Sequence, residues 1–189
     1  MTDECAALLG GLDLLERAVG YTLGNLRLVS AAHLSRPTPC AGWTLAQLLA
    51  HLDDSLLALH EAADLGHVTL DVPEVAGDPV LGLRARATGL LAAWTAAEAP
   101  DRVDVGGALL TSGILTTAGA FEVAVHGWDV AQACGSPRPL PEPLAEDLLA
   151  VAPLLLPEAD RPGRFAPAVP VPPFAGASDH LLAFTGRRP

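Results

Sequence analysis

Residues 122–129 of this chain read Glu-Val-Ala-Val-His-Gly-Trp-Asp. Glu122 and His126 are four residues apart, so on a helix both side chains leave the same face, one turn from each other. The other residues of that face are apolar, namely Ala118, Val125 and Val130. We therefore expect the pair to point into a helical core. A carboxylate buried without a counter-charge is costly, and protonation, an ion pair or a bound metal would each relieve that cost.

A second segment of the same kind lies far upstream, where His51 belongs to the largely apolar stretch 43–52. If the two helices face each other, His51, Glu122 and His126 form a three-ligand site that leaves coordination positions open. Such openness is typical of reactive rather than structural metal sites. Neutral imidazole and carboxylate ligands suit zinc, iron, nickel or cobalt, and the pattern does not choose among them. The alternative is a hydrogen bond between Glu122 and His126 along one helix face, with no metal.

Helical periodicity predicts the fold around these two segments. Apolar residues recur at helical spacing over about 3–33, 44–65, 80–97 and from Thr111 or Thr116 to Cys134. Thr44, followed three residues later by Gln47, forms a capping box at the start of the second helix. Gly135 marks the end of the fourth helix. Residues 66–80 are expected to form a loop, and residues 103–110 a short strand or an extended connection.

The chain changes character after the fourth helix. A short helix is expected near 142–155, followed by a proline-rich segment that cannot pack as regular structure and therefore wraps around the outside. A last short helix over 178–184 would dock the C-terminus. With no internal repeat or domain boundary, we predict one helical domain over 1–189, with a bundle at 1–136 and a C-terminal extension at 137–189. The predicted fold class is all-α, a four-helix bundle with a proline-rich C-terminal wrap.

Composition excludes several classes of function. A formal net charge of −11 argues against nucleic acid and against an anionic membrane surface, because both need a basic face. All eleven basic residues are arginines, so no lysine Schiff base, lysine general base or P-loop lysine is available. No window approaches the roughly 18 apolar residues of a membrane-spanning helix, and the N-terminus is acidic where a signal peptide is basic. With three scattered cysteines and no C-x-x-C, the protein is expected to be cytoplasmic.

Three separated stretches of the chain resemble a known family. Residues 38–44 (Thr-Pro-Cys-Ala-Gly-Trp-Thr), followed by 48–52 (Leu-Leu-Ala-His-Leu), resemble the start of the metal-binding helix in actinobacterial DinB-like proteins. These proteins are related to the N-terminal domain of mycothiol-dependent maleylpyruvate isomerase. Residues 122–129 resemble the second metal motif of that group, and 165–169 with 182–189 resemble its C-terminal signature. The resemblance spans almost the whole chain, with the motifs in the family's order.

The resemblance implies a DinB-like four-helix bundle that binds a divalent metal, commonly zinc, through His51, Glu122 and His126. It also implies mycothiol, a low-molecular-weight thiol, as a cosubstrate of some members. Because a metal lowers the pKa of a bound thiol, we predict a metal-dependent, thiol-using enzyme, an isomerase or S-transferase that acts on a small electrophile. The alternative is a non-catalytic metal- or small-molecule-binding protein of the same fold. The expected partners are a small thiol and an electrophile, and a homodimer is left open.

A metal–water hydrolase is a weaker third hypothesis, because no further Glu or His stands beside the predicted ligands as a general base. Asp129, one turn after His126, either accepts the imidazole N–H that the metal does not use or contacts solvent at the helix end. Cys40, Trp43 and Trp128 are expected to pack rather than react, although either tryptophan could form a pocket wall.

Other polar residues receive simpler predictions. Arg164 in the proline-rich segment is a candidate clamp for an acidic substrate. Asp53 and Asp54 follow shortly after His51 and are expected on a solvated face, with the alternative that Asp54, three residues after His51, reaches the metal region. The four remaining histidines are expected at surface or loop positions, with the last of them in a tail that could fold over the site (His33, His60, His67 and His180).

Overall fold

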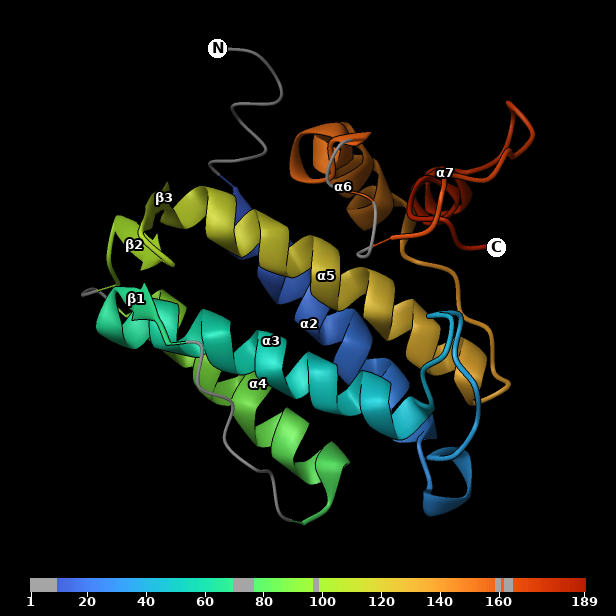
Figure 1. Cartoon of the computed structure of the whole chain (residues 1–189), viewed down its shortest axis with the longest axis horizontal. Coiled ribbons are helices and arrows are strands. Elements are labelled where there is room, and N and C mark those ends of the chain that lie inside the picture. The colour runs from blue at the N-terminus through green and yellow to red at the C-terminus, as the bar shows by residue number, and fades with distance from the viewer. Residues whose placement is uncertain (1–9, 70–76, 97–98, 159–160, 162–164) are drawn as a thin grey trace.

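Helices dominate the architecture of the protein. The computed structural model describes residues 10–69, 77–96, 99–158, 161 and 165–189, and every element below belongs to these residues. Four long helices form a bundle, α2 (Gly11–Asn25), α3 (Leu45–Leu65), α4 (Pro79–Thr95) and α5 (Ser112–Ala133) (Figure 1). Within the described residues, no helix combines the length and apolar character needed to cross a membrane. The predicted fold class, a helical bundle, is confirmed.

α3 begins and α5 ends where the caps predict, and of the two possible starts of α5 the structure has the one at Thr111. Thr44 accepts a hydrogen bond from the backbone N–H of Gln47, and the Gln47 side chain accepts one from the Thr44 N–H at 2.9 Å, so the capping box at the start of α3 is formed. Thr111 caps α5 by accepting from the N–H of Ile114. Gly135 follows α5 with a φ of 72°, a left-handed conformation that glycine adopts at little cost.

The first helix is shorter than the periodicity predicts. α2 ends at Asn25, and the chain continues in two single 3₁₀ turns, Leu26–Leu28 and Ala31–His33, instead of one helix to residue 33. The Asn25 side chain donates to a backbone carbonyl of α5 at 3.0 Å, and Ser30 is extended and caps the second turn. Asn and Ser form such bonds more readily than they extend a helix, which explains the early end. Residues 3–9 of the predicted helix lie outside the described part of the chain.

Small residues allow α2 and α5 to pack closely. The Thr22 hydroxyl of α2 donates to the carbonyl oxygen of Val123 in α5 at 2.8 Å. Gly127 lies against the same threonine, and a Cβ at Gly127 would be 3.2 Å from the Cα of Thr22. Fully buried leucines of α3 complete the core beside this helix pair, namely Leu45, Leu48, Leu49 and Leu52. α3 also packs against α4 and α5, so the two motif helices are neighbours.

A small three-stranded sheet accompanies the bundle. β1 (His67–Val68) pairs in parallel with β2 (Arg102–Val105), which pairs antiparallel with β3 (Ala108–Thr111). Gly106 and Gly107, both with positive φ, form the tight turn between β2 and β3. Residues 103–110, predicted as a strand or an extended connection, therefore belong to a hairpin. Within the predicted loop 66–80, residues 67–68 form a strand, and residues 70–76 lie outside the described part of the chain. Figure 1 shows the sheet at the end of the bundle where α3 ends and α5 begins.

Two shorter helices, α6 (Glu142–Leu155) and α7 (Ala177–Phe184), follow the bundle at the predicted places. α6 packs against α7 and also contacts α2 and α5 (Figure 1). The backbone N–H of Ala177 donates to the Glu142 carboxylate at 2.8 Å, which ties the start of α7 to the start of α6. Residues 165–176 contain no helix or strand, as the density of prolines predicts. This path brings the C-terminal segment back toward α5, the helix that carries Glu122 and His126.

The single tyrosine of the chain, Tyr21 on α2, provides a direct test of how α2 packs against the segment between α5 and α6. Tyr21 donates its hydroxyl to the carbonyl oxygen of Arg138 at 2.8 Å, and burial raises the pKa of Tyr21 to about 12. The unfolded pKa is about 10, so the neutral phenol stabilises the folded state below pH 10, and this contribution is lost as the pH rises from 10 to 12. We expect the tyrosinate absorbance of native protein to rise near pH 12, and that of urea-unfolded protein near pH 10. Equal midpoints for the two samples would contradict this packing.

Candidate metal centre

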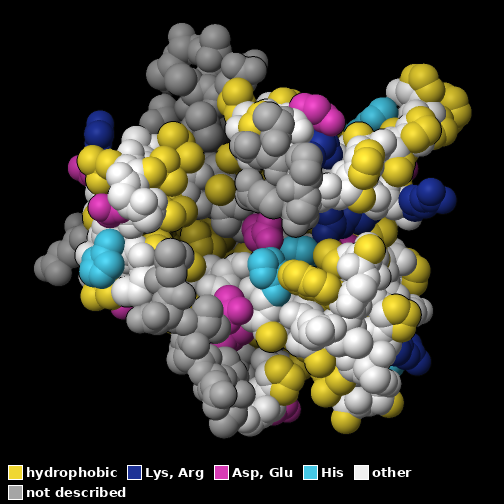
Figure 2. All heavy atoms as spheres, in the orientation of Figure 1, with side chains coloured by type: hydrophobic (Ala, Val, Ile, Leu, Met, Phe, Trp, Pro, Cys, Tyr) yellow, Lys and Arg dark blue, Asp and Glu magenta, His cyan; other side chains and the backbone are white. Residues whose placement is uncertain are grey.

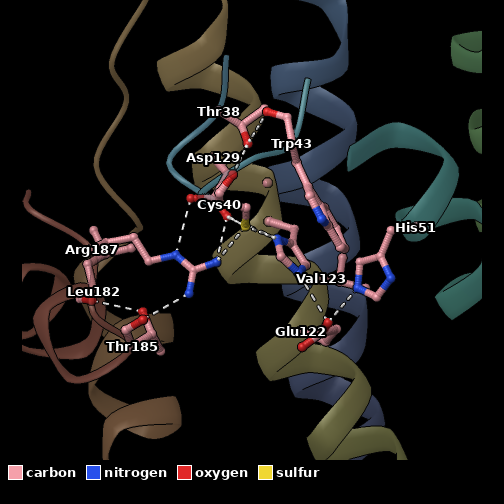
Figure 3. A network of polar contacts seen from close by, with 12 residues as sticks. Thr38, Cys40, Trp43, His51, Glu122, Val123, Asp129, Leu182, Thr185 and Arg187 are labelled. Atoms are coloured by element: carbon pink, nitrogen blue, oxygen red, sulfur yellow. Dashed lines mark hydrogen bonds and ion pairs between the residues drawn. The ribbon is translucent and has the colours of Figure 1, made fainter. Parts of the chain in front are cut away.

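Three potential metal ligands converge from two helices. His51 lies on α3, and Glu122 and His126 lie one turn apart on α5. The Nε2 atom of His51 is 2.8 Å from Oε1 of Glu122, and Nε2 of His126 is 3.1 Å from the same oxygen. Figure 3 shows His51 and Glu122 extending toward each other from their separate helices. The residues that the spacing singles out thus lie together in space.

The arrangement of these donors fits a divalent transition metal. One ligand atom from each of the three residues lies within 4.8 Å of the other two. Donors about 2.0–2.2 Å from a single ion lie roughly 3–3.5 Å from one another, close to the two contacts that Glu122 makes. Two imidazoles and a carboxylate suit zinc, iron, nickel or cobalt and leave coordination positions for other molecules. The role of the three residues as ligands stays a prediction, which this geometry supports.

The candidate ligands border an open cavity of about 610 Å³. In Figure 2, histidine, acidic and arginine side chains gather around a depression near the middle of the face. The described lining comes from the 39–43 loop, from α3 and α5, and from the C-terminal segment between Phe165 and Arg187. This volume is in the range of small-molecule sites. The cavity therefore gives a small molecule access to the three candidate ligands.

A buried carboxylate holds the other side of the His126 ring. Nδ1 of His126 is 2.9 Å from Oδ2 of Asp129, which is fully buried. Asp129 thus lies beside the imidazole and not in a solvent contact at the helix end. Arg187 donates to both oxygens of this carboxylate, at 2.7 Å from Nη2 and 3.3 Å from Nε (Figure 3). The residue patterns do not single out Arg187, and its place in the C-terminal signature at 182–189 is the one sequence signal for it.

Cys40 faces the cavity, so the expectation that it only packs is incomplete. Its Sγ atom is 3.3 Å from Oδ2 of Asp129, 3.2 Å from Nη2 of Arg187 and 3.7 Å from Nδ1 of His126. Cys40, His126 and Asp129 therefore form a second group with ligand-like spacing. The guanidinium of Arg187 already contributes a positive charge to this second group. We accordingly place the candidate metal at the Nε2 side of His126, not at this group.

Charge pairing sets the ionisation of the site. Burial alone would raise the pKa of Glu122, but hydrogen bonds from His126 and His51 outweigh it and lower that pKa below its usual value. Burial likewise opposes the charge of His126, yet hydrogen bonds with Asp129, Cys40 and Glu122 raise its pKa well above the usual value. The pKa of Asp129 is lowered against burial by His126 and by the charge of Arg187. Two carboxylates are therefore held as anions by their His and Arg partners, and a metal at Nε2 of His126 would have to displace the proton that the raised pKa of His126 favours.

The two tryptophans near the motifs have different surroundings. Trp43 lines the cavity, with its ring centroid 5.0 Å from that of His51 and 6.5 Å from that of His126. Trp128 is buried in the core. Of the two tryptophans that were predicted as possible pocket walls, Trp43 therefore forms part of the cavity wall.

The other singled-out residues that the structure describes do not line the cavity. Asp53 is buried, not solvated, because Arg86 of α4 pairs with both carboxylate oxygens at 2.7 and 2.9 Å. Asp54 and the four remaining histidines are absent from the described lining. Arg164, the predicted clamp, lies outside the described residues. The Asp53–Arg86 pair joins α3 to α4 and so has a structural role.

Fold and site together define a class of protein, a DinB-like helical bundle with two histidines and a glutamate at a small-molecule cavity. The family model of the mycothiol maleylpyruvate isomerase N-terminal domain matches residues 15–131, and the chain belongs to this family. Two relatives from strains of Mycobacterium tuberculosis, each named an uncharacterized protein, are 30% identical to it over 197 aligned residues. The alignments cover 91% of this chain and 94% of each relative. No solved structure matches the chain significantly.

Proposed function

We propose that this protein is a metal-dependent enzyme that uses a small thiol, mycothiol in the first instance, in an isomerisation or S-transfer on a small electrophile. The observation that carries the proposal is the convergence of His51, Glu122 and His126 at an open cavity of about 610 Å³. Three ligands beside a cavity suit a reactive centre, whereas structural sites are usually closed by four protein ligands. Membership in a family named for a mycothiol-dependent isomerase supports the choice of thiol.

His51, Glu122 and His126 would hold the ion, with zinc as the first candidate. When bound, a divalent ion would supply a Lewis acid that favours the thiolate form of a thiol at neutral pH. Glu122 contributes the negative charge of the ligand set. Asp129 accepts the Nδ1–H of His126, so the Nε2 atom of that ring is turned toward Glu122.

The cavity walls offer both apolar contact and one cation. Trp43 and Phe165 provide aromatic surface, while Arg187 reaches the cavity from the C-terminal side. Arg187 has five N–H donors, and its hydrogen bonds within the described residues, to Asp129, Cys40 and Thr185, use four of them. The remaining Nη1–H has no partner among the described residues and would donate to an oxygen of the thiol or the electrophile. In this proposal Arg187 takes the role of clamp for an acidic group.

The described lining also favours a thiol nucleophile over water. Apart from the candidate ligands His51, Glu122 and His126, the described lining residues include no Asp, Glu or His. A metal–water hydrolase normally needs a further general base within reach of the reacting water. A thiol activated at the ion needs no such base, so the residues present suit thiol chemistry better.

Binding of mycothiol should depend on the metal. We expect calorimetric titration to give an affinity for zinc-loaded protein at least about tenfold higher, equal to 1.4 kcal/mol, than for protein stripped of metal. Mycothiol with a methylated sulfur is the matched control and should bind both forms equally, since it cannot form a thiolate. Equal affinity of mycothiol for both forms, or no binding to either, would favour the non-catalytic binding protein.

A further inference from the structure

A chain of charged contacts runs from the C-terminal segment to a candidate metal ligand. Arg187 pairs with Asp129, and Asp129 in turn contacts Nδ1 of His126. Arg187 is 7% exposed and Asp129 is 0% exposed. The cost of removing two charges from water offsets much of the attraction between them, so a pair buried this deeply is weak evidence for stability alone. Its position directly behind His126 points to a different role.

The backbone after α7 is shaped to aim Arg187 at this carboxylate. Gly186 has a φ of 81°, and a Cβ there would be 2.8 Å from the carbonyl oxygen of Ala166. The turn is closed by the N–H of Arg187, which donates to the carbonyl oxygen of Leu182 at 2.9 Å. The Thr185 carbonyl oxygen, two residues earlier in the chain, accepts a hydrogen bond from Nη1 of Arg187 at 3.0 Å and so holds the guanidinium in place. Only glycine fits this turn without strain, and the turn carries the side chain back toward α5 (Figure 3).

We propose that Arg187 is a positioning residue that acts through Asp129 on His126, so that the C-terminal segment is a working part of the site. The guanidinium fixes the Asp129 carboxylate, and the carboxylate fixes the Nδ1–H of His126, so that Nε2 lies beside His51 and Glu122. The inference rests on the proposed metal site. Hydrogen-bond partners of metal-binding histidines orient the ring and raise its basicity. The matched family region, 15–131, contains Asp129 but ends before Arg187, so the later segment supplies this support.

The first test is the zinc affinity of Arg187→Gln in the full chain, measured by competition with a chromogenic chelator. We expect a roughly 10- to 100-fold loss, the range seen when a partner of a ligating histidine is removed. Arg188→Gln is the matched control, because Arg188 is the next residue and is exposed, and it should keep the wild-type affinity. Arg187→Lys should be intermediate, since lysine keeps the charge but not the two-pronged geometry.

A double-mutant cycle distinguishes positioning from general stabilisation. If Arg187 acts through Asp129, the variant Arg187→Gln/Asp129→Asn loses no more zinc affinity than Asp129→Asn alone. If Arg187 merely stabilises the C-terminal segment, the two losses multiply. Multiplied losses would overturn the proposal.

A readout without metal separates this inference from the proposed function. In zinc-free wild-type protein, the Nδ1 proton of His126 should give a slowly exchanging downfield proton NMR signal. We expect Arg187→Gln to lose this signal and Arg188→Gln to keep it. If the wild-type protein binds no zinc, the proposed function fails and this signal alone decides the inference. If Arg187→Gln does not fold, Arg187→Lys replaces it in both measurements. A wild-type zinc affinity and a wild-type proton signal in whichever of the two variants folds would overturn the inference.

Discussion

Alanine at His126 or at His51 is expected to abolish stoichiometric zinc binding and to leave the helical fold intact. Each change removes one of three ligands, so the loss of affinity should exceed the roughly 10- to 100-fold effect of removing an outer partner. The fold should survive because the core leucines of α3 are fully buried and are not among the candidate ligands. In His126→Ala, moreover, Asp129 keeps Arg187 as its partner at 2.7 Å. Metal quantification after gel filtration, together with circular dichroism, measures both outcomes.

His60→Ala is the matched control for these two variants. His60 also lies on α3, pairs with Asp64 at 3.2 Å and does not line the cavity. This variant should bind zinc with wild-type stoichiometry. Full zinc binding by both His51→Ala and His126→Ala would refute the ligand assignment. Loss of helical signal in either variant would show that the metal is needed for folding.

Gly127→Ala should lower the free energy of unfolding by about 1–3 kcal/mol or more, the usual cost of overpacking a core. A Cβ at Gly127 would be 3.1 Å from the Cβ and 3.2 Å from the Cα of Thr22, and also too close to its hydroxyl. Backbone cannot yield as a flexible side chain can, so α2 and α5 must separate. The clash should outweigh the roughly 0.5–1 kcal/mol that alanine gains over glycine within a helix. Urea denaturation with a constant m value gives the difference.

The matched control for this change is Gly20→Ala in the partner helix α2. A Cβ at Gly20 would meet no atom within 4 Å, so the same substitution should there raise the free energy of unfolding by about 0.5–1 kcal/mol. Opposite signs for the two glycines are the expected result. Stabilisation by Gly127→Ala would show that α2 and α5 are not held this closely. Because His126 adjoins Gly127, the zinc affinity of Gly127→Ala should also fall.

The features that the sequence predicts correctly are local ones. The capping box of Thr44 and Gln47 and the glycine stop at Gly135 each involve groups within a few residues of one another. The same holds for Glu122 and His126, whose shared helix face follows from a spacing of four residues. Short-range hydrogen bonds and the helix period determine these features, so the residue types suffice to predict them.

Predictions go wrong where distant segments decide the outcome. The early end of α2 depends on a bond from Asn25 to α5, 102 residues away. Asp53 is expected in solvent because nothing near it in the chain reveals its pairing with Arg86, 33 residues later. The preferences of the neighbouring residues alone would continue the helix past Asn25 and leave Asp53 in solvent. In each case a partner on another helix changes that outcome.

By itself, the sequence determined where the long helices lie, the cap at Thr44, the stop at Gly135 and the pairing of Glu122 with His126 on one face. Only the tertiary structure decided that His51 meets Glu122 from 71 residues away, and that Arg187 reaches Asp129 from 58 residues away beside Cys40. The physical reason is that helix period and capping act over one or two turns. Contacts between segments instead depend on which small residues let α2, α3 and α5 approach, and on where the turn at Gly186 directs the end of the chain.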